Sequence, residues 1–500
     1  METPFLGGTY VSKSRDLVYN RAVNIYPELV ETKEGKAVGA MYGCDGLKQL
    51  ATTFAGQPVR GLYFASNGVL YGVVGHFVFS CDQFFRVTYL GGGSSQLLTN
   101  SGSVNFADNG QQLLIIDGLN GWCLNFSTQV FTNVLPGNIS GIPLTLTYQD
   151  GFALVGFAGG NKFYQSNLND FTAWNGLAFS SADSTPTKIT AMFDVNREVW
   201  IFKSDRTEVW DNIGASPFAF QRVPGVQIQQ GCVAQFSIAR IDNTIVWLGL
   251  DEQGQGVVYR SQGYNAVRIS THSIERVISG MANITDAIGY VYQKVGHIFY
   301  MLTFPTGNMT FCYDAVTKLW HERALFAPNS TVSFTGISPL NAGFNRHISI
   351  SYAFAYNTHV VGSYTGFLYS FSEDSYTDYD LGGGKVPRKW LRTWRALPPN
   401  KEVFTPMRFN SLQIDCQTGI SIPDGTSPQF ILRWSDDGGF TWSSEVFADG
   451  DQPGFVGTRV LFQRLGATKR GKGTDRIFEL SQVDSVPVAI IGADLDAEML

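Results

Sequence analysis

Residues 198–212 read EVWIFKSDRTEVWDN: an apolar stretch, a short polar turn and a second stretch rich in apolar and aromatic residues. Polar turn residues with large apolar residues on both sides are typical of a β-hairpin. Related stretches begin at residues 71, 113, 152, 244, 297 and 359. One short β unit therefore recurs along most of the chain.

The spacing of these units indicates the fold. They follow one another at intervals of roughly forty to sixty residues, and a period in the forties with internal hairpins is typical of β-propeller blades. We count seven candidate blades, with six as the alternative. The last intervals are wider, which indicates insertions, with residues 324–349 as the candidate. Helical patterns are scarce, and HSIERVISGM (272–281) is the best candidate for a short helix.

Composition changes after the last unit. Acidic residues from 372 onward give way to a glycine-rich stretch, a basic stretch and a Pro pair that ends near residue 400. Such a change predicts a domain boundary. The chain is therefore all-β, and we divide it into an N-terminal arm (1–45), a propeller (46–380), a linker (381–400) and a small C-terminal β-sandwich (401–500).

The charge balance limits the possible partners. Charged residues make up 16% of the chain, well below the roughly 25% of an average soluble domain, and the formal net charge is −6. This balance excludes a broadly basic nucleic-acid-binding protein. It permits a conduit for nucleic acid. Each phosphate that a protein neutralises adds affinity, and this would slow the passage of the nucleic acid through a conduit.

Neither a metal site nor a targeting segment is evident. The six cysteines form no C-x-x-C pair, and the six histidines show no H-x-x-x-H or H-x-H spacing. We therefore expect buried free thiols, no metal and no cofactor. The first residues lack a basic region followed by an apolar stretch, and the aliphatic runs are too short to span a bilayer. We expect a chain that folds in a reducing compartment.

One motif near the C-terminus suggests a different function. Ser435, Asp437, Gly439, Thr441 and Trp442 spell S-x-D-x-G-x-T-W, which resembles the Asp-box of sialidases and other propeller glycosidases. In such a box the polar side chains bond backbone amides of the turn, and the Trp packs beneath the hairpin. A glycosidase also needs a set of catalytic side chains that a single box does not supply. We therefore expect a structural turn.

Two basic clusters are candidate docking surfaces. The first lies in the expected linker and comprises Lys385, Arg388, Lys389, Arg392 and Arg395, interleaved with Trp390 and Trp394. The second comprises Arg459, Arg464, Lys469, Arg470, Lys472 and Arg476. Such segments dock on acidic protein surfaces, form solvated loops or bind single-stranded nucleic acid. We favour docking over the other two.

Several further stretches share their order with one family. FKSDRTEVWDNIGA (202–215) carries Phe202, Ser204, Glu208, Gly214 and Ala215 at the family's spacing, and QIQQGCVA (227–234) and STHSIERVI (270–278) follow it. RVLFQRLG (459–466) and IFELSQVDSVPVAIIGADLDAE (477–498) match the closing strands, and AVNIYPELVE, MYGCDGLKQLA and VRGLYF match the start. The chain thus resembles the tail hub or nozzle proteins of short-tailed bacteriophages (podoviruses), also called packaged-DNA stabilisation proteins.

The resemblance implies a structural virion protein without catalytic activity, assembled in the host cytoplasm. It implies a homohexameric ring below the portal and adaptor proteins, which retains packaged double-stranded DNA, conducts it without sequence-specific binding and carries fibres or tailspikes. We expect the sandwich and the N-terminal arm to meet the adaptor, and the propeller with its insertions to face the fibres. Candidates for an acidic channel wall are Glu373, Asp374, Asp378 and Asp380.

Two alternatives remain open from the sequence. The Asp-box favours a glycan-processing or glycan-binding propeller. The repeats also fit a monomeric intracellular scaffold similar to Kelch or WD-repeat hubs.

Overall fold

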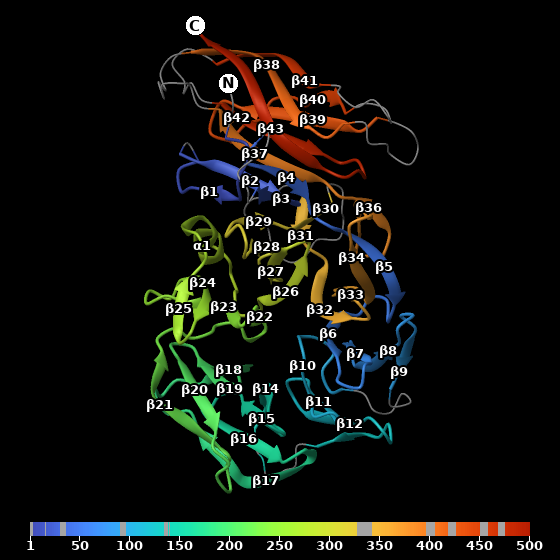
Figure 1. Ribbon diagram of the computed structural model, residues 1–500, viewed down its shortest axis with the longest axis vertical. Helices are drawn as coiled ribbons and strands as arrows, with labels where there is room; N and C mark the ends of the chain where they lie inside the picture. The colour runs from blue at the N-terminus through green and yellow to red at the C-terminus, as the bar shows by residue number, and fades with distance from the viewer. Residues whose placement is uncertain are drawn as a thin grey trace.

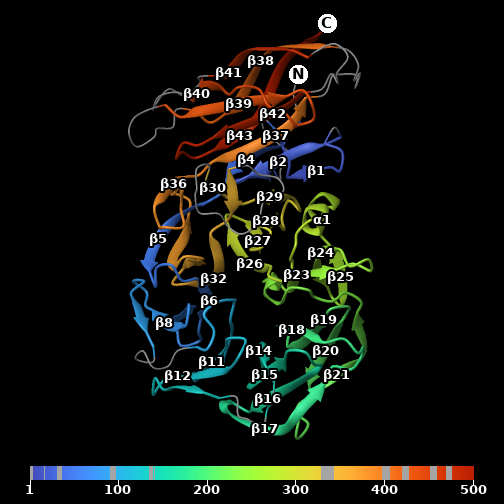
Figure 2. The same ribbon diagram turned by 180° about the vertical axis from the view of Figure 1, so that it is seen from behind.

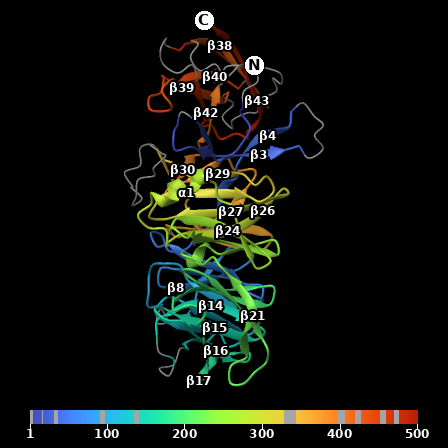
Figure 3. The ribbon, with the colours of Figure 1, turned by 90° about the vertical axis from the view of Figure 1, so that its left-hand side faces the viewer.

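The computed structural model describes residues 4–15, 17–30, 37–90, 97–134, 139, 141–327, 343–396, 406–418, 427–450, 459–468 and 476–500. It comprises a β-propeller and a β-sandwich that lies at the rim of the propeller (Figure 1). Both chain ends lie in the sandwich, and the view from behind shows the same arrangement (Figure 2). Seen from the side, the propeller is edge-on below the sandwich (Figure 3).

Within the described residues the propeller has seven blades, each of four antiparallel strands. The first three are β6–β9 (Val59–Phe64, Leu70–Val74, Phe77–Cys81, Val87–Tyr89), β10–β13 (Asn105–Asp108, Gln112–Ile116, Gly121–Asn125, Phe131–Asn133) and β14–β17 (Pro143–Gln149, Phe152–Phe157, Lys162–Asn167, Asp170–Ser181). The next three are β18–β21 (Ile189–Val195, Glu198–Lys203, Thr207–Asn212, Phe220–Ile228), β22–β25 (Ala239–Ile241, Thr244–Leu250, Gly256–Gln262, Asn265–Arg268) and β26–β29 (Ile288–Lys294, His297–Phe304, Met309–Asp314, Trp320–Glu322).

The seventh blade closes the ring with a strand from the other end of the propeller. Strands β32 (Ser349–Ala355), β33 (Thr358–Ser363) and β34 (Phe367–Ser372) are followed in the sheet by β5 (Gly46–Thr52). In this pair Phe371 lies opposite Leu47 and Ser370 opposite Lys48. The prediction of an all-β propeller is confirmed, and the count of seven blades, rather than six, fits this structure.

Repeated hairpins form blades because their apolar residues meet those of the neighbouring blade. Leu154 and Phe163 of the third blade share one buried cluster with Ile201 and Trp210 of the fourth. Some inner strands also approach closely: a Cβ at Gly289 of β26 would lie 2.6 Å from the carbonyl oxygen of Ser237, so glycine is required there.

The expected short helix is present as α1 (His272–Ser279), between the fifth and sixth blades. Thr271 is its N-cap and accepts a hydrogen bond from the Ile274 amide. The helix contacts the N-terminal segment, since Ser273 Oγ accepts from the Val11 amide and Arg276 donates to the carbonyl oxygens of Val11 and Ser12.

The sandwich is made from both ends of the chain. One sheet contains β1 (Tyr10–Val11), β2 (Tyr19–Val23), β37 (Trp390–Ala396), β42 (Arg476–Gln482), β39 (Gln429–Ser435) and β40 (Val446–Asp449). The other contains β3 (Ile25–Leu29), β4 (Gly39–Gly43), β43 (Ala489–Met499), β38 (Met407–Cys416) and β41 (Val460–Ala467). The N-terminal arm is therefore part of both sheets.

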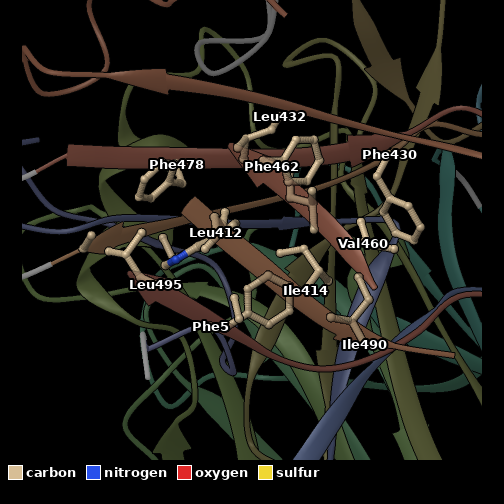
Figure 4. Close-up of a cluster of buried hydrophobic side chains, with 14 of the residues drawn as sticks. Phe5, Leu412, Ile414, Phe430, Leu432, Val460, Phe462, Phe478, Ile490 and Leu495 are labelled. Carbon is tan, nitrogen blue, oxygen red and sulfur yellow. The ribbon is translucent and has the colours of Figure 1, made fainter. Parts of the chain in front are cut away.

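Large apolar side chains fill the space between the two sheets (Figure 4). Leu412, Leu432, Phe462 and Phe478 are almost completely buried there. Phe5 of the N-terminal segment completes this core, with its ring 4.8 Å from that of Trp394. The sandwich core thus depends on residues from both ends of the sequence.

The segment 381–400, expected as a linker, contains strands β36 (Lys385–Pro387) and β37. β36 pairs with β35 (Thr377–Tyr379), and β37 pairs with β2 on one side and β42 on the other. All seven residues of β37 are buried. In place of a solvated linker, this segment supplies an interior strand of the sandwich.

Candidate functional site

The first basic cluster points inward. Arg388, Arg392 and Arg395 are buried, while Lys385 is exposed and Lys389 half-buried. Arg392 Nε donates to the carbonyl oxygen of Phe5 (2.7 Å), and its Nη1 donates to those of Gly8 and Arg21 (both 3.2 Å). These contacts fasten the N-terminal segment to β37, so the three buried arginines are not available for docking.

A buried ion pair joins the two domains. Arg21 on β2 donates to Glu322 on β29 through Nε (3.0 Å) and Nη2 (2.7 Å). Burial lowers the pKa of Arg21, but the charge of Glu322 and its hydrogen bonds raise it more, so the net shift is upward. Arg21 is therefore charged, and removal of either partner would leave the other buried without its ion-pair contact.

Asn24 lies where three strands meet, next to this ion pair. Its backbone has φ 55°, a conformation that Asn tolerates better than most residues. Its Nδ2 donates to the carbonyl oxygens of Ala324 (2.7 Å) and Lys389 (2.9 Å), and its Oδ1 accepts from the Ala324 amide (2.9 Å). One side chain thus bonds β30 (Ala324–Phe326) and the residue before β37.

The expected insertion leaves the propeller at this junction. β30 pairs with β31 (Phe344–Arg346), and Phe326 and Phe344 pack with Val23 and Leu391 of the sandwich. Residues 328–342, the centre of that insertion, lie outside the described part of the chain.

The second basic cluster is divided between surface and interior. Arg459 and Arg464 are exposed, and Lys469, Arg470 and Lys472 lie outside the described residues. Arg476 is buried and donates to both carboxylate oxygens of Asp436 (2.6 and 2.8 Å). Arg459 and Arg464 are therefore the described members that remain available to a partner.

The four acidic candidates lie at the end of the seventh blade and in the β35–β36 hairpin. Asp378 is buried beneath this surface, and burial raises its pKa, so it cannot form part of a wall. Asp380 accepts from the amides of Gly382 and Gly384 and shapes the hairpin turn. Glu373 lies 3.7 Å from Lys294 Nζ, and Asp374 is exposed.

The Asp-box forms a hydrogen-bonded turn at the edge of the sandwich. Asp437 Oδ1 accepts from the amides of Phe440 (3.0 Å) and Thr441 (2.8 Å), and Ser435 Oγ accepts from the Gly439 amide (2.9 Å). The Thr441 hydroxyl and these amides lower the pKa of Asp437 to about 2. Trp442 packs against the ring of Tyr19, with centroids 6.3 Å apart.

Sequence reasoning missed the axial cavity of the propeller. Inner strands of six blades and the segment before β22 of the fifth line a space of about 530 Å³, and its wall includes Tyr63, Tyr148, Tyr290 and Tyr352. Tyr290 and Tyr352 stack at 5.1 Å. The volume is typical of a small-molecule pocket and far too small for a duplex whose major groove alone is about 12 Å wide. The recurring units found in the sequence correspond to the second and third strands of each blade, so they do not include the inner strands that line this space.

The other reactive side chains of the described residues are the potential metal ligands and the thiols. No three His, Cys, Asp or Glu side chains within this part of the chain are grouped closely enough to hold a metal ion. All six cysteines are unbonded and five are buried, and burial raises the pKa of the Cys232 thiol to about 12.

Within the described residues no helix has the length and apolar character needed to cross a membrane.

Comparisons with solved structures give distant fold matches. They include "Streptogramin B lyase structure" (TM-score 0.42, 10% identity, covering 70% of this chain and 98% of that chain). They also include "Crystal Structure of the N-terminal Domain of Nup159" (TM-score 0.40, 12% identity, covering 70% and 99%). No curated protein sequence matches the chain.

Family models cover nearly the whole sequence. The model described as "Bacteriophage P22 Gp10, beta-propeller" matches residues 1–375, and "Bacteriophage P22 Gp10, beta-sandwich" matches residues 389–498. Both domain types agree with the structure, and the resemblance to phage tail hub proteins is confirmed. The chain therefore belongs to the bacteriophage P22 Gp10 family of phage tail proteins.

Proposed function

We propose that this chain is the tail hub, or nozzle, of a short-tailed phage. In this role a homohexameric ring closes the channel of the portal and adaptor proteins, retains packaged DNA, conducts it during ejection and carries fibres or tailspikes. Membership of a phage structural family supports the coarse assignment to the virion. The ring, its partners and its lack of catalytic activity are our proposal.

The fused architecture is the observation that carries the proposal. Two domains joined by the Arg21–Glu322 ion pair and by Asn24 form one stiff body. Such a body can transmit a fixed orientation from an adaptor at the sandwich to fibres at the propeller.

The DNA path in this proposal runs between subunits. A single propeller encloses about 530 Å³, so the duplex must pass through a bore that several subunits surround. Glu373, Asp374 and Asp380 remain candidates for its wall, and Asp378 is withdrawn because it is buried. A wall of this kind would hold phosphates weakly.

Adaptor binding can be tested with charge reversal on the sandwich. The double variant Arg459→Glu/Arg464→Glu changes two exposed side chains of β41 and its flank. Lys188→Glu/Arg222→Glu, also exposed, makes the same charge change on the propeller. We expect the first variant to lose binding to purified portal–adaptor complexes in sedimentation, and the control to bind as the unmodified chain does.

Equal binding by both variants would contradict docking through the sandwich. Electron microscopy of the complex tests the ring directly, and a Lys- and Arg-lined bore would overturn the proposed weakly binding wall. Turnover of a fluorogenic sialoside by the purified chain would instead revive the glycan-processing alternative.

A further inference from the structure

A second cavity of about 490 Å³, called the mouth below, adjoins the axial cavity. The mouth is formed where inner strands β6, β26 and β32 begin, and it shares Arg60, Ser103 and Phe236 with the axial cavity. Apolar residues such as Ile288 and Ile350 alternate in its wall with polar ones. A concave space with a few placed polar groups is typical of a small-molecule site.

Arg60 contributes a buried positive charge to this mouth. Arg60 is only 2% exposed. The guanidinium donates to the carbonyl oxygens of Gly102 (2.6 Å), Gly75 (2.9 Å) and Thr99 (2.7 Å) and to Thr99 Oγ1 (2.6 Å). These neutral acceptors fix its position without cancelling its charge, and burial lowers its pKa to about 10.

Arg346 contributes a second buried guanidinium from another blade connection. The residue is 3% exposed, and its amide donates to Asn308 Oδ1 (2.9 Å). Its guanidinium carbon lies 4.9 Å from the centre of the Tyr364 ring. Burial lowers its pKa to about 10, although the charges of Tyr364 and Asp286 oppose this shift.

Asp286 is the one carboxylate in the described wall of the mouth. Its Oδ2 accepts from the amide (2.8 Å) and hydroxyl (2.6 Å) of Thr306. Its Oδ1 is buried without a hydrogen-bond partner. A buried acceptor of this kind is costly unless a ligand or water donates to it. The wall therefore has two guanidinium groups, one carboxylate and one unused acceptor.

We propose that the mouth binds a small sugar bearing a phosphate or a carboxylate. The positive charges of the two buried guanidinium groups attract the oxyanion. A sugar hydroxyl donates to Asp286 Oδ1, and the apolar wall contacts the carbon face of the ring. This site is independent of ring assembly and DNA passage.

The test uses an exposed residue of the mouth, so that the buried contacts stay intact. Ser101 is exposed and lines the mouth. Ser101→Glu adds a carboxylate there, and Ser101→Gln adds a neutral side chain of similar size. Calorimetry with the full chain measures binding of glucose 6-phosphate, glucuronate, glucose and inorganic phosphate.

We expect the anionic sugars to bind the unmodified chain and Ser101→Gln alike. Ser101→Glu should weaken them roughly tenfold, because like charges repel at close range. Equal affinity for glucose would overturn the role of the oxyanion, and equal affinity for inorganic phosphate would overturn the role of the sugar. No binding of either anionic sugar at millimolar concentration, or no effect of Ser101→Glu, would overturn the site. Adaptor binding plays no part in this measurement, so its failure leaves the proposed function untouched.

Discussion

Neighbouring propeller blades meet mainly through apolar side chains, as where Phe163 packs edge-on against Trp210 with ring centres 5.1 Å apart. The junction between propeller and sandwich instead buries Arg21, Glu322 and Asn24. Apolar contacts accept many partners of similar volume. A buried charge depends on one particular partner atom. The contacts between blades thus tolerate other apolar side chains of similar volume. The junction instead fixes one specific arrangement of the two domains.

The largest expected effect breaks the junction. Arg21→Ala leaves the carboxylate of Glu322 buried without its partner, so the free energy of unfolding should fall by about 3–5 kcal/mol. Urea denaturation followed by tryptophan fluorescence measures this change. The double variant Arg21→Met/Glu322→Leu removes both charges and should recover most of the loss. A double variant as unstable as Arg21→Ala would show that volume, and not charge pairing, sets the junction.

A pH-dependent effect of intermediate size concerns His321, also at the junction. Burial and then the charge of Arg323 lower its pKa to about 3. Between pH 6.5 and 3 the unfolded chain binds a proton that the folded chain does not, so stability falls as the pH falls. His321→Gln should reduce this slope by up to about 1.4 kcal/mol per pH unit.

The comparison of the two slopes isolates His321 from other groups. Burial also lowers the pKa of His347 and His359, while the hydrogen bond with Asp314 raises that of His297. These residues are the same in both chains, so their contributions cancel in the difference. Identical slopes from pH 7 to 4 would mean that the pKa of His321 is the same in the folded and unfolded chains.

The smallest expected effect lies at the Asp-box, away from the junction. Asp437→Ala removes the acceptor of two amides and should lower the free energy of unfolding by about 1 kcal/mol. Because the pKa of Asp437 is lowered to about 2, its contribution is present above about pH 4 and is lost as the pH falls through 2. Thermal unfolding of both chains at pH 7 and pH 2 tests the size of this loss and its disappearance at low pH. A loss of unfolding free energy as large as that of Arg21→Ala would show that the Asp-box stabilises the chain as strongly as the junction does.

The sequence predicted the local parts of this molecule well. The hairpins, the propeller class, helix α1 and the additional sandwich follow from residue patterns within short windows, and the structure has all of them. The Asp437 contacts are also local, since their partners are within four residues.

Pairings between distant residues could not be predicted in this way. Arg21 meets Glu322 across 301 positions, and Thr393 Oγ1 bonds the Tyr19 carbonyl across 374. The stretch WLRTWRA (390–396) combines arginines with tryptophans, which suggested an exposed docking surface. Its arginines are buried and bond the arm: Arg392 donates to the carbonyl oxygens of Phe5 and Gly8, and Arg395 to that of Arg15. The mouth residues Arg60, Asp286 and Arg346 come from three distant segments of the chain, and no short pattern joins them.

The closing strand β5 imposes an order on biosynthesis. Its partner β34 begins only at Phe367. In the same way, β2 can pair with β37 only after the chain has been made to Trp390, so more than 300 residues are synthesised between the two strands of each pair. At the usual rate of synthesis the ribosome needs roughly 15 to 60 s to cover that interval. During this time the early strands have unpaired edges, which are open to wrong partners. The ring can therefore close only late in synthesis, and crowded polysomes are where this chain is most exposed to aggregation.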